Sequence, residues 1–229
     1  MTKRTYGQYC GLANALDLIG ERWTLLIVRD LAIAPKRFSD LLEGLPGIGT
    51  SLLSERLHHL EDQGLARRAV ADRPTGGVVY ELTEEGQALA VAMSGLATWG
   101  AARLEAQEGA EFRPDWAMFA LQCAFNPERA AGVHDCYEFR LEGTPFWVLI
   151  DDGDLEVSYE KPRKPDFILT TDVPTLARLG TGVISPEEAM ASGRATFQGD
   201  PEAGMRSLRL LGSADAVPLP IRRGRRATR

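Results

Sequence analysis

Residues 47–65 (GIGTSLLSERLHHLEDQGL) limit the fold more than any other part of the chain. At about 100° per residue, three leucines gather on one side of a helix: Leu53, Leu57 and Leu60. The opposite side carries short or polar groups: Ser51, Ser54, Glu55, His58, His59 and Asp62. Gly49 or Thr50 suits the start of this helix, and Gly64 suits its end. A short helix of this kind fits a DNA major groove, although most such helices only face water.

Three further helices are predicted before this stretch, over residues 9–19, 23–32 and 35–45. The second is apolar enough to be buried, with three residues expected to face outward: Thr24, Arg29 and Asp30. Pro46 and Gly47 form a turn between the third helix and the next one. Two helices joined by a tight turn, with the second presented outward, make a helix-turn-helix arrangement.

The sequence pattern changes from helical to strand-like after Gly64. Residues 66–71 and 78–82 are strand-like, and a turn-rich hairpin tip separates them. A long apolar-striped helix is then expected over residues 84–107. This order of elements predicts a winged-helix module, mainly α with a β-hairpin wing. Three wing arginines then lie near the height of a DNA backbone, although a solvated strand edge explains them equally well: Arg67, Arg68 and Arg73.

Several motifs together resemble the HxlR family of bacterial winged-helix transcriptional regulators, over about residues 8–105. They are Cys10, Ile19-Gly20, Trp23-Thr24, Arg37-Phe38, Leu45-Pro46-Gly47-Ile48, Leu53, Arg56-Leu57, Leu60, Gly64-Leu65 and Tyr80-Glu81-Leu82-Thr83. The resemblance implies a homodimer built from the first and last helices of this domain. It also implies that the dimer binds an inverted-repeat operator in double-stranded DNA.

The predicted DNA contacts come from the approach to the outward helix, from that helix and from the wing. They are Lys36, Arg37, Thr50, Ser51, Ser54, Glu55, Arg56, His58, Arg67, Arg68, Arg73 and Thr75. Members of the family often carry a serine at position 49 and a basic residue at position 51. The absence of that cation removes a phosphate contact and should flatten the salt dependence of binding. The attachment to the backbone is therefore expected from Lys36, Arg37 and the wing.

Two residues leave alternatives open. Arg56 falls between the leucine side and the outward side, so it either reaches a phosphate or pairs with an acid such as Glu61 or Asp40. Cys10 lies where some members of the family sense oxidants, and a first helical turn lowers the pKa of a thiol. The alternative is a small buried cysteine without redox chemistry.

The second half predicts an α+β layer. Helices are expected over residues 116–125, 172–179 and 200–211, and a short helix is expected to start at residues 185–188. Strands are expected over residues 137–141, 146–150, 155–159, 166–171 and 194–198. These strands are expected to form an antiparallel sheet with the helices on one side.

The segment around residues 115–213 resembles the sterol-carrier-protein-like domain. Its markers are Pro165-Asp166, Leu176, Leu179-Gly180, Ser185-Pro186-Glu187-Glu188-Ala189, Ser192-Gly193-Arg194 and Gly199-Asp200. The resemblance implies an apolar cavity between sheet and helices that holds a lipid-like or other hydrophobic molecule. Six aromatic residues are candidates to line it, with an ordinary core as the alternative: Trp116, Phe119, Phe125, Phe146, Trp147 and Phe167.

The predicted domains are a winged helix over residues 1–109, a sterol-carrier-like domain over 110–215, and a tail over 216–229. The tail is expected to be disordered and is basic, with five arginines: Arg222, Arg223, Arg225, Arg226 and Arg229. The net charge of −6 weighs mildly against DNA binding. The prediction of DNA binding therefore rests on the local geometry of the helix-turn-helix and the wing.

Composition and motifs exclude several classes of protein. No apolar run approaches a membrane span or a signal peptide, and three widely spaced cysteines fit a reducing cytoplasm. The sequence lacks a phosphate-binding glycine loop, a dinucleotide fingerprint, a nucleophile elbow and a zinc-binding histidine spacing. We therefore expect a cytoplasmic protein that is not an enzyme and that has no cofactor, metal or membrane partner.

These features predict a dimeric DNA-binding transcriptional regulator of the HxlR type. The fused second domain suggests control by a hydrophobic small molecule. The alternative is a hydrophobic-ligand carrier protein whose winged helix serves mainly for dimerisation.

Overall fold

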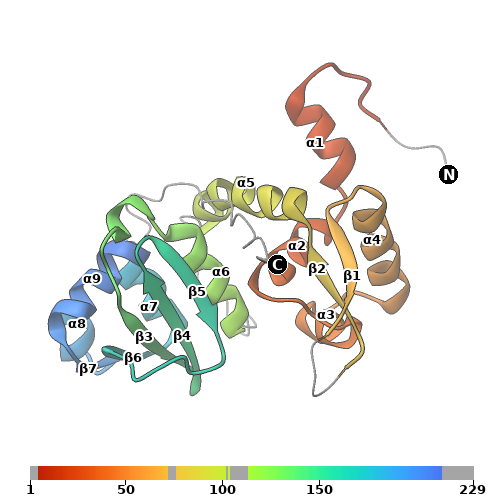
Figure 1. The fold of residues 1–229 in the computed structure, drawn as a ribbon. Coiled ribbons are helices and arrows are strands. Elements are labelled where there is room, and N and C mark those ends of the chain that lie inside the picture. Colours follow the sequence, from red (N-terminus) through yellow and green to blue (C-terminus); the bar gives the residue numbers. More distant parts are fainter. Residues whose placement is uncertain (1–4, 72–75, 102, 104–112, 213–229) are drawn as a thin grey trace. The chain divides into compact units, whose positions relative to one another are not determined.

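The computed structural model describes residues 5–71, 76–101, 103 and 113–212 (Figure 1). These residues fall into two compact units, one up to Ala90 and one from Val91. Helix α5 (Glu84–Ala101) runs through that division. The boundary expected at residue 109 lies outside the described residues and stays a prediction, as does the tail from residue 216.

The first unit is a winged helix, as the sequence predicts. Its helices are α1 (Gly11–Ile19), α2 (Thr24–Ile33), α3 (Phe38–Gly44) and α4 (Thr50–Asp62). They are followed by a two-stranded antiparallel hairpin, β1 (Ala66–Val70) and β2 (Val78–Leu82), in which Ala66 pairs with Leu82. The start of α5 completes the unit.

The core of the first unit forms where the leucine spacing places it. Leu53, Leu57 and Leu60 of α4 are almost fully buried. Gly64 has a φ of +68° just beyond α4, a left-handed conformation that glycine adopts without the steric cost of a Cβ. α4 therefore ends where the sequence indicates, and the chain turns directly into β1.

The prediction that Thr24 and Asp30 face outward is wrong. Their exposed fractions are 0% and 2%, and only Arg29 of the three reaches toward solvent. The Arg29 guanidinium lies 2.8 Å from the Asp30 carboxylate. A buried carboxylate requires such a partner.

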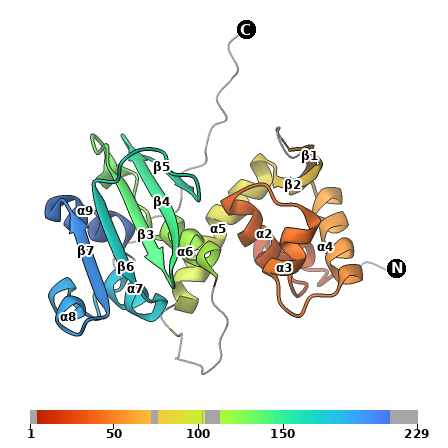
Figure 2. The same ribbon diagram turned by 90° about the horizontal axis from the view of Figure 1, so that it is seen from below.

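The second unit is a five-stranded sheet with helices packed against it. Its elements are α6 (Pro114–Ala124), the 3₁₀ turn η1 (Glu128–Ala130), β3 (Cys136–Leu141), β4 (Thr144–Asp151), β5 (Asp154–Ser158), β6 (Phe167–Thr171), α7 (Val173–Gly180), α8 (Pro186–Ala191), β7 (Ala195–Gly199) and α9 (Pro201–Leu211). The strand order is β5-β4-β3-β6-β7, and α8 lies beside the edge strand β7 (Figure 2). The α+β class is confirmed.

The prediction of a wholly antiparallel sheet is wrong. β3 and β6 run parallel, with Tyr137 opposite Phe167, while the other neighbours are antiparallel. The local turn signals indicate hairpins, and β3, β4 and β5 are indeed joined in that way. The chain then passes back across the sheet before β6, and no local pattern records the direction in which it returns.

The predicted helix starts in this unit are confirmed by their caps. The Asp172 carboxylate accepts a hydrogen bond from the backbone of Thr175 at 2.7 Å at the start of α7. Ser185 and Glu188 form a reciprocal capping box at α8. The Asp200 carboxylate accepts from the backbone of Glu202 at α9. Each cap satisfies a donor that a helix start leaves open.

One polar network ties α9 to β3. The Asp135 carboxylate accepts two hydrogen bonds from the Arg206 guanidinium, at 2.7 and 3.1 Å, and a third from the Tyr137 hydroxyl at 2.7 Å. Burial by itself raises the pKa of Asp135, but the hydrogen bonds from Arg206 and Tyr137 outweigh it and hold that pKa below its ordinary value. The network therefore contributes stability mainly when Asp135 is ionised.

We predict that Asp135→Asn lowers the opening free energy of β3 and α9 by about 2 kcal/mol at pH 7, because Arg206 is partly exposed and the cost of a fully buried pair is discounted. Amide hydrogen exchange of the full chain measures it. Because the folded pKa is lowered, the difference between wild type and variant is present above pH ~4 and shrinks as the pH falls further. Tyr137→Phe is the milder control, at about 1 kcal/mol. Unchanged exchange in Asp135→Asn contradicts the assignment.

Candidate nucleic-acid interface

Helix α4 presents a polar face to solvent. Of the six residues predicted for its outward side, five are exposed: Ser51, Ser54, Glu55, His58 and Asp62. The prediction is wrong for His59, which is half-buried, whereas Thr50 at the start of the helix is also exposed. Their positions follow from the burial of the leucines, because a helix that encloses one side must expose the other. The face is narrow and has no arginine or lysine among these residues. It can accept and donate hydrogen bonds but offers little attraction to phosphates.

Arg56 does not belong to that face. Its exposed fraction is 9%, and its guanidinium donates to the Arg22 carbonyl at 3.1 Å. The two remaining nitrogens contact the carboxylates of Glu55 at 2.8 Å and Glu21 at 3.2 Å. Of the two predicted alternatives, the acid pairing is the one present, but the suggested partners Glu61 and Asp40 are wrong.

His59 also connects α4 to the segment at the end of α1. Its Nε2 lies 2.7 Å from the Leu18 carbonyl, near the end of α1. Arg56 and His59 therefore attach one side of α4 to the connection between α1 and α2. No local pattern indicates the Arg22 or the Leu18 carbonyl as a partner, because these contacts join residues 34 and 41 positions apart.

The two cations expected to hold the DNA backbone before α4 both contact the wing, Lys36 through its backbone and Arg37 through its side chain. The backbone of Lys36 exchanges two hydrogen bonds with Tyr80 of β2, at 2.9 and 2.8 Å. The Arg37 guanidinium donates to the Gly76 carbonyl at the base of the hairpin tip and packs close to Gly77. Arg37 therefore fixes the wing against the start of α3 in this structure.

Two of the three wing arginines are described, and both are more than half exposed. Arg67 pairs with Glu81 at 2.7 Å. Arg68 pairs with Glu61 at 3.1 Å, and its guanidinium lies 5.5 Å from the centre of the Tyr80 ring. Exposed pairs of this kind are weak, so a phosphate can replace the acid at little cost. Arg73 and Thr75 lie outside the described residues, and their DNA contacts stay predictions.

Cys10 is exposed at the residue that precedes α1. The backbone N–H groups of Ala13 and Leu12, in the first turn, lower the pKa of its thiol. The two other cysteines differ. Burial raises the pKa of Cys123 to about 12 and also raises that of Cys136. Cys10 is therefore the most readily ionised of the three thiols.

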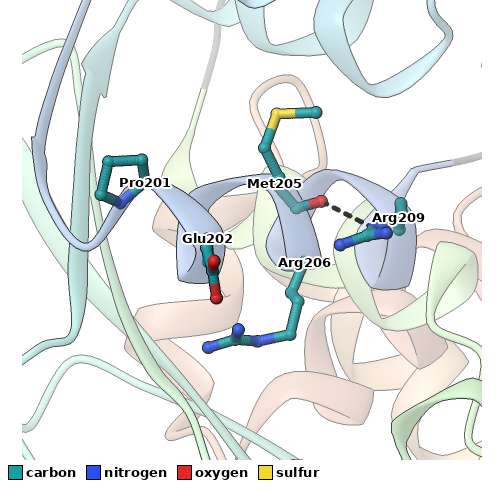
Figure 3. A pocket seen from close by; sticks show the side chains of 5 residues that line it. All are labelled: Pro201, Glu202, Met205, Arg206 and Arg209. Carbon is teal, nitrogen blue, oxygen red and sulfur yellow. Dashed lines mark hydrogen bonds between the residues drawn. The ribbon is translucent and has the colours of Figure 1, made fainter.

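The aromatic residues predicted to line a ligand cavity lie in the core of the second unit. Phe119, Phe125, Phe146 and Phe167 have exposed fractions of 5% or less, and the Phe146 ring stacks on Phe139 at 5.4 Å. Trp116 and Trp147 are half-buried. Two hollows that the described residues form lie along α9 (Figure 3 shows one of them) and are lined by none of these six. The cavity stays a prediction.

The described residues contain no helix long and apolar enough to cross a membrane. Within the same residues, no group of three or more His, Cys, Asp and Glu side chains is placed to hold a metal ion.

Comparison with known proteins agrees with both units. A family model described as HxlR-like helix-turn-helix matches residues 18–108, and one described as SCP-2 sterol transfer family matches residues 120–212. Fold and matches together define the class: a winged helix-turn-helix protein with a fused sterol-carrier-like α+β domain.

Its relatives place the chain within that class. It is 36% identical over 88 residues to the HTH-type transcriptional regulator YodB of Bacillus subtilis, which covers 38% of this chain and 79% of the relative. It is also 36% identical over 86 residues to YvaP, an uncharacterized HTH-type transcriptional regulator of the same organism, covering 38% and 80%. The chain belongs to the HxlR-like helix-turn-helix family, whose relatives named here are transcriptional regulators.

Solved structures of YodB from B. subtilis also match. The reduced form has a TM-score of 0.36 at 35% identity, over 40% of this chain and 91% of YodB. The quinone-bound form has a TM-score of 0.34 at 35% identity, over 39% and 93%.

We predict that Arg56→Ala destabilises the first unit by about 1–2 kcal/mol, because it removes a buried side chain and its hydrogen bond to the Arg22 carbonyl, while the pairs with the exposed carboxylates of Glu21 and Glu55 add little. The salt dependence of DNA binding should keep its slope, since Arg56 is committed within the protein. Arg67→Ala is the matched control: stability changes by no more than about 0.5 kcal/mol, and the slope falls by about one. Denaturation and DNA titration across salt concentrations measure both. A reduced slope in Arg56→Ala would mean that Arg56 contacts a phosphate.

Proposed function

We propose that this protein is a homodimeric, DNA-binding transcriptional regulator that reads an inverted repeat with α4. The observation that carries the proposal is the exposed polar face of α4 above a buried leucine side, within a family of helix-turn-helix regulators. α4 selects bases, and the wing arginines attach to the backbone. A regulator of this kind acts in the cytoplasm, where bacterial DNA lies.

The acidic residue on the reading face has a specific role in this proposal. Glu55 lies in the centre of the face, where a free carboxylate would repel phosphates. Arg56 holds its Oε1 at 2.8 Å, which offsets part of the charge and limits the rotamers of Glu55. An oriented carboxylate accepts a hydrogen bond from the amino group of cytosine in the major groove. We therefore expect a cytosine in each half-site.

The homodimer is supported by apolar side chains on two helices. Leu12 and Leu16 of α1 are exposed by 70% and 43%, and Leu96 and Trp99 of α5 by 56% and 59%. Large exposed apolar side chains close together on one helix are typical of surfaces that a partner covers. A second copy of the chain brings the same faces with it, as a two-fold interface requires.

Control by a small molecule is proposed for the second unit, and the match to the SCP-2 sterol transfer family supports it. A hydrophobic ligand shifts DNA binding only if its affinity differs between the DNA-bound and the free dimer.

Control by oxidation is proposed for Cys10, because its thiol is exposed and its pKa is lowered. YodB has structures in reduced and quinone-bound forms, so a quinone is a suitable oxidant for Cys10 beside the labelling reagent used below.

We predict that the full-length dimer binds the DNA upstream of its own gene with a sequence preference that weakens as salt rises. Ser54→Glu should lower the affinity at least about tenfold, because it places an extra carboxylate against the groove. Gln198→Glu adds the same charge at an exposed site of β7 and should bind as the wild type does. Fluorescence anisotropy with specific and scrambled duplexes measures these affinities. Equal affinity for the specific and the scrambled duplex contradicts the proposed regulator and favours the alternative of a carrier protein.

The same titration tests ligand control when it is repeated with fatty acids, sterols and apolar aromatic compounds. A compound that binds the protein must change the affinity for DNA. Binding without any such change would separate the second unit from regulation.

For Cys10, we predict that iodoacetamide labels this residue first, with a pH midpoint below that of an ordinary cysteine thiol. The reason is that the first turn of α1 stabilises the thiolate, so a larger fraction is ionised at neutral pH. Cys123 and Cys136 should stay unlabelled in the folded protein, and Cys10→Ser should remove the reaction. Mass spectrometry across pH identifies the sites. Equal labelling of all three cysteines rules out a selective sensor.

A further inference from the structure

Residues 21–24, which join α1 to α2, form a tight turn with an unusual third residue. The Thr24 amide donates to the Glu21 carbonyl at 3.3 Å, and this hydrogen bond closes the turn. Trp23 has a φ of +77° and a ψ of −23°. These are the angles of the third residue in a type II turn, a position that favours glycine or asparagine. Tryptophan is strained there, because a Cβ in the left-handed region lies too close to the backbone carbonyl that follows.

A relaxed alternative exists for the same four residues. In a type I turn the third residue has a φ of about −90°, and the turn is closed by the same hydrogen bond. The two turn types differ by a rotation of the central peptide, which here joins Arg22 to Trp23. That rotation reverses the direction of the Arg22 carbonyl and leaves the ends of the turn in place. Tryptophan by itself therefore favours the type I turn, so other contacts must hold the type II turn.

Two contacts to the helix-turn-helix hold the strained form. The Arg22 carbonyl, in the central peptide, accepts a hydrogen bond from Nε of the buried Arg56 at 3.1 Å. The Trp23 indole lies against the turn between α3 and α4, since a Cβ placed on Gly47 would be 3.7 Å from its Cη2. The Arg22 guanidinium lies 5.5 Å from the centre of the indole. Reversal of the central peptide would take the acceptor away from Arg56, whose buried Nε would then lack a partner.

These two contacts act on α4 at two separate places. Gly47 lies two residues before Gly49, which caps the start of α4, and Arg56 lies midway along the helix. The turn at residues 21–24 therefore restrains both the start and the middle of α4. A helix held at one point can pivot, whereas a helix held at two points keeps its direction. The strain at Trp23 is the free energy that this placement costs.

We propose that the type II turn at residues 21–24 positions α4 for base reading, with Trp23 as the positioning residue. This inference rests on the proposed function, in which α4 reads the bases. Trp23 needs no contact with DNA in this role. Its ring contacts the start of α4, and its left-handed backbone directs the Arg22 carbonyl toward Arg56. When the turn relaxes, α4 loses its alignment with the bases, so discrimination between operator and other DNA falls.

Three substitutions at one position separate the strain from the ring. Trp23→Gly, Trp23→Asn and Trp23→Ala all remove the indole. They differ in the left-handed region, which glycine adopts freely, asparagine tolerates and alanine disfavours. Nε of Arg56 reports the turn directly, because its N–H exchanges slowly with water only while the Arg22 carbonyl accepts it. NMR of the full-length protein measures that exchange, and fluorescence anisotropy with specific and scrambled duplexes measures discrimination.

We expect the Nε–H of Arg56 to exchange near the wild-type rate in Trp23→Gly and about tenfold faster or more in Trp23→Ala, with Trp23→Asn between them. The ratio of the two DNA affinities should follow the same order, with the largest fall, about tenfold, in Trp23→Ala. Equal behaviour of Trp23→Gly and Trp23→Ala overturns the proposal, because the ring alone would then matter. If Trp23→Ala does not fold, the comparison of Trp23→Gly with Trp23→Asn decides in the same way.

The two measurements also separate this proposal from the proposed function. A wild-type protein that binds both duplexes equally contradicts the proposed function, and with it any role of Trp23 in base reading. A wild-type preference that persists undiminished in Trp23→Ala contradicts the positioning role alone. Fast exchange of the Arg56 Nε–H in the wild type would show that the type II turn is not held, and it overturns the proposal without any DNA.

Discussion

The buried guanidinium of Arg56 is the interaction on which the position of the reading helix depends. A charge with an exposed fraction of 9% is stable only when its donors are satisfied, and here the guanidinium contacts the Arg22 carbonyl and the carboxylates of Glu21 and Glu55. Two of them, the Arg22 carbonyl and Glu21, belong to the connection between α1 and α2. Any displacement of α4 against that connection breaks these bonds together. The leucine side supplies most of the burial energy, while Arg56 selects the orientation.

The same arrangement explains why the reading face is poor in cations. The arginine within α4 turns inward, and Arg37 is held at the base of the wing by the Gly76 carbonyl. What remains outward on α4 is suited to distinguishing bases and contributes little electrostatic attraction. In the proposed function, attachment to the backbone falls to Arg67 and Arg68, whose pairs with nearby acids are exposed and easily exchanged. The proposal thus assigns base selection and attachment to different elements.

Features with a local origin were predictable from the sequence, and features that need a distant partner were not. The leucine spacing located α4, and the residues around Asp172 and Ser185 located two helix starts, because each signal lies within a few positions. The burial of Asp30 and the parallel pairing of β3 with β6 have no such signal. For the candidate site, exposure of the α4 face followed from periodicity. The inward turn of Arg56 depends on a carbonyl 34 positions away.

The packing of the second unit constrains the proposed control by a hydrophobic ligand. Its sheet–helix core is filled by rings such as Phe125, Phe146 and Phe167, and the ring of Phe167 lies so close to Gly204 that a Cβ there would be 2.5 Å away. A hydrophobic molecule that enters this core must displace side chains packed at close to crystal density. That requirement favours a second conformation with a looser core, and binding to it would be weakened by its low population. The same requirement links sensing to a change of shape, because a ligand that enters without rearrangement transmits nothing to the winged helix.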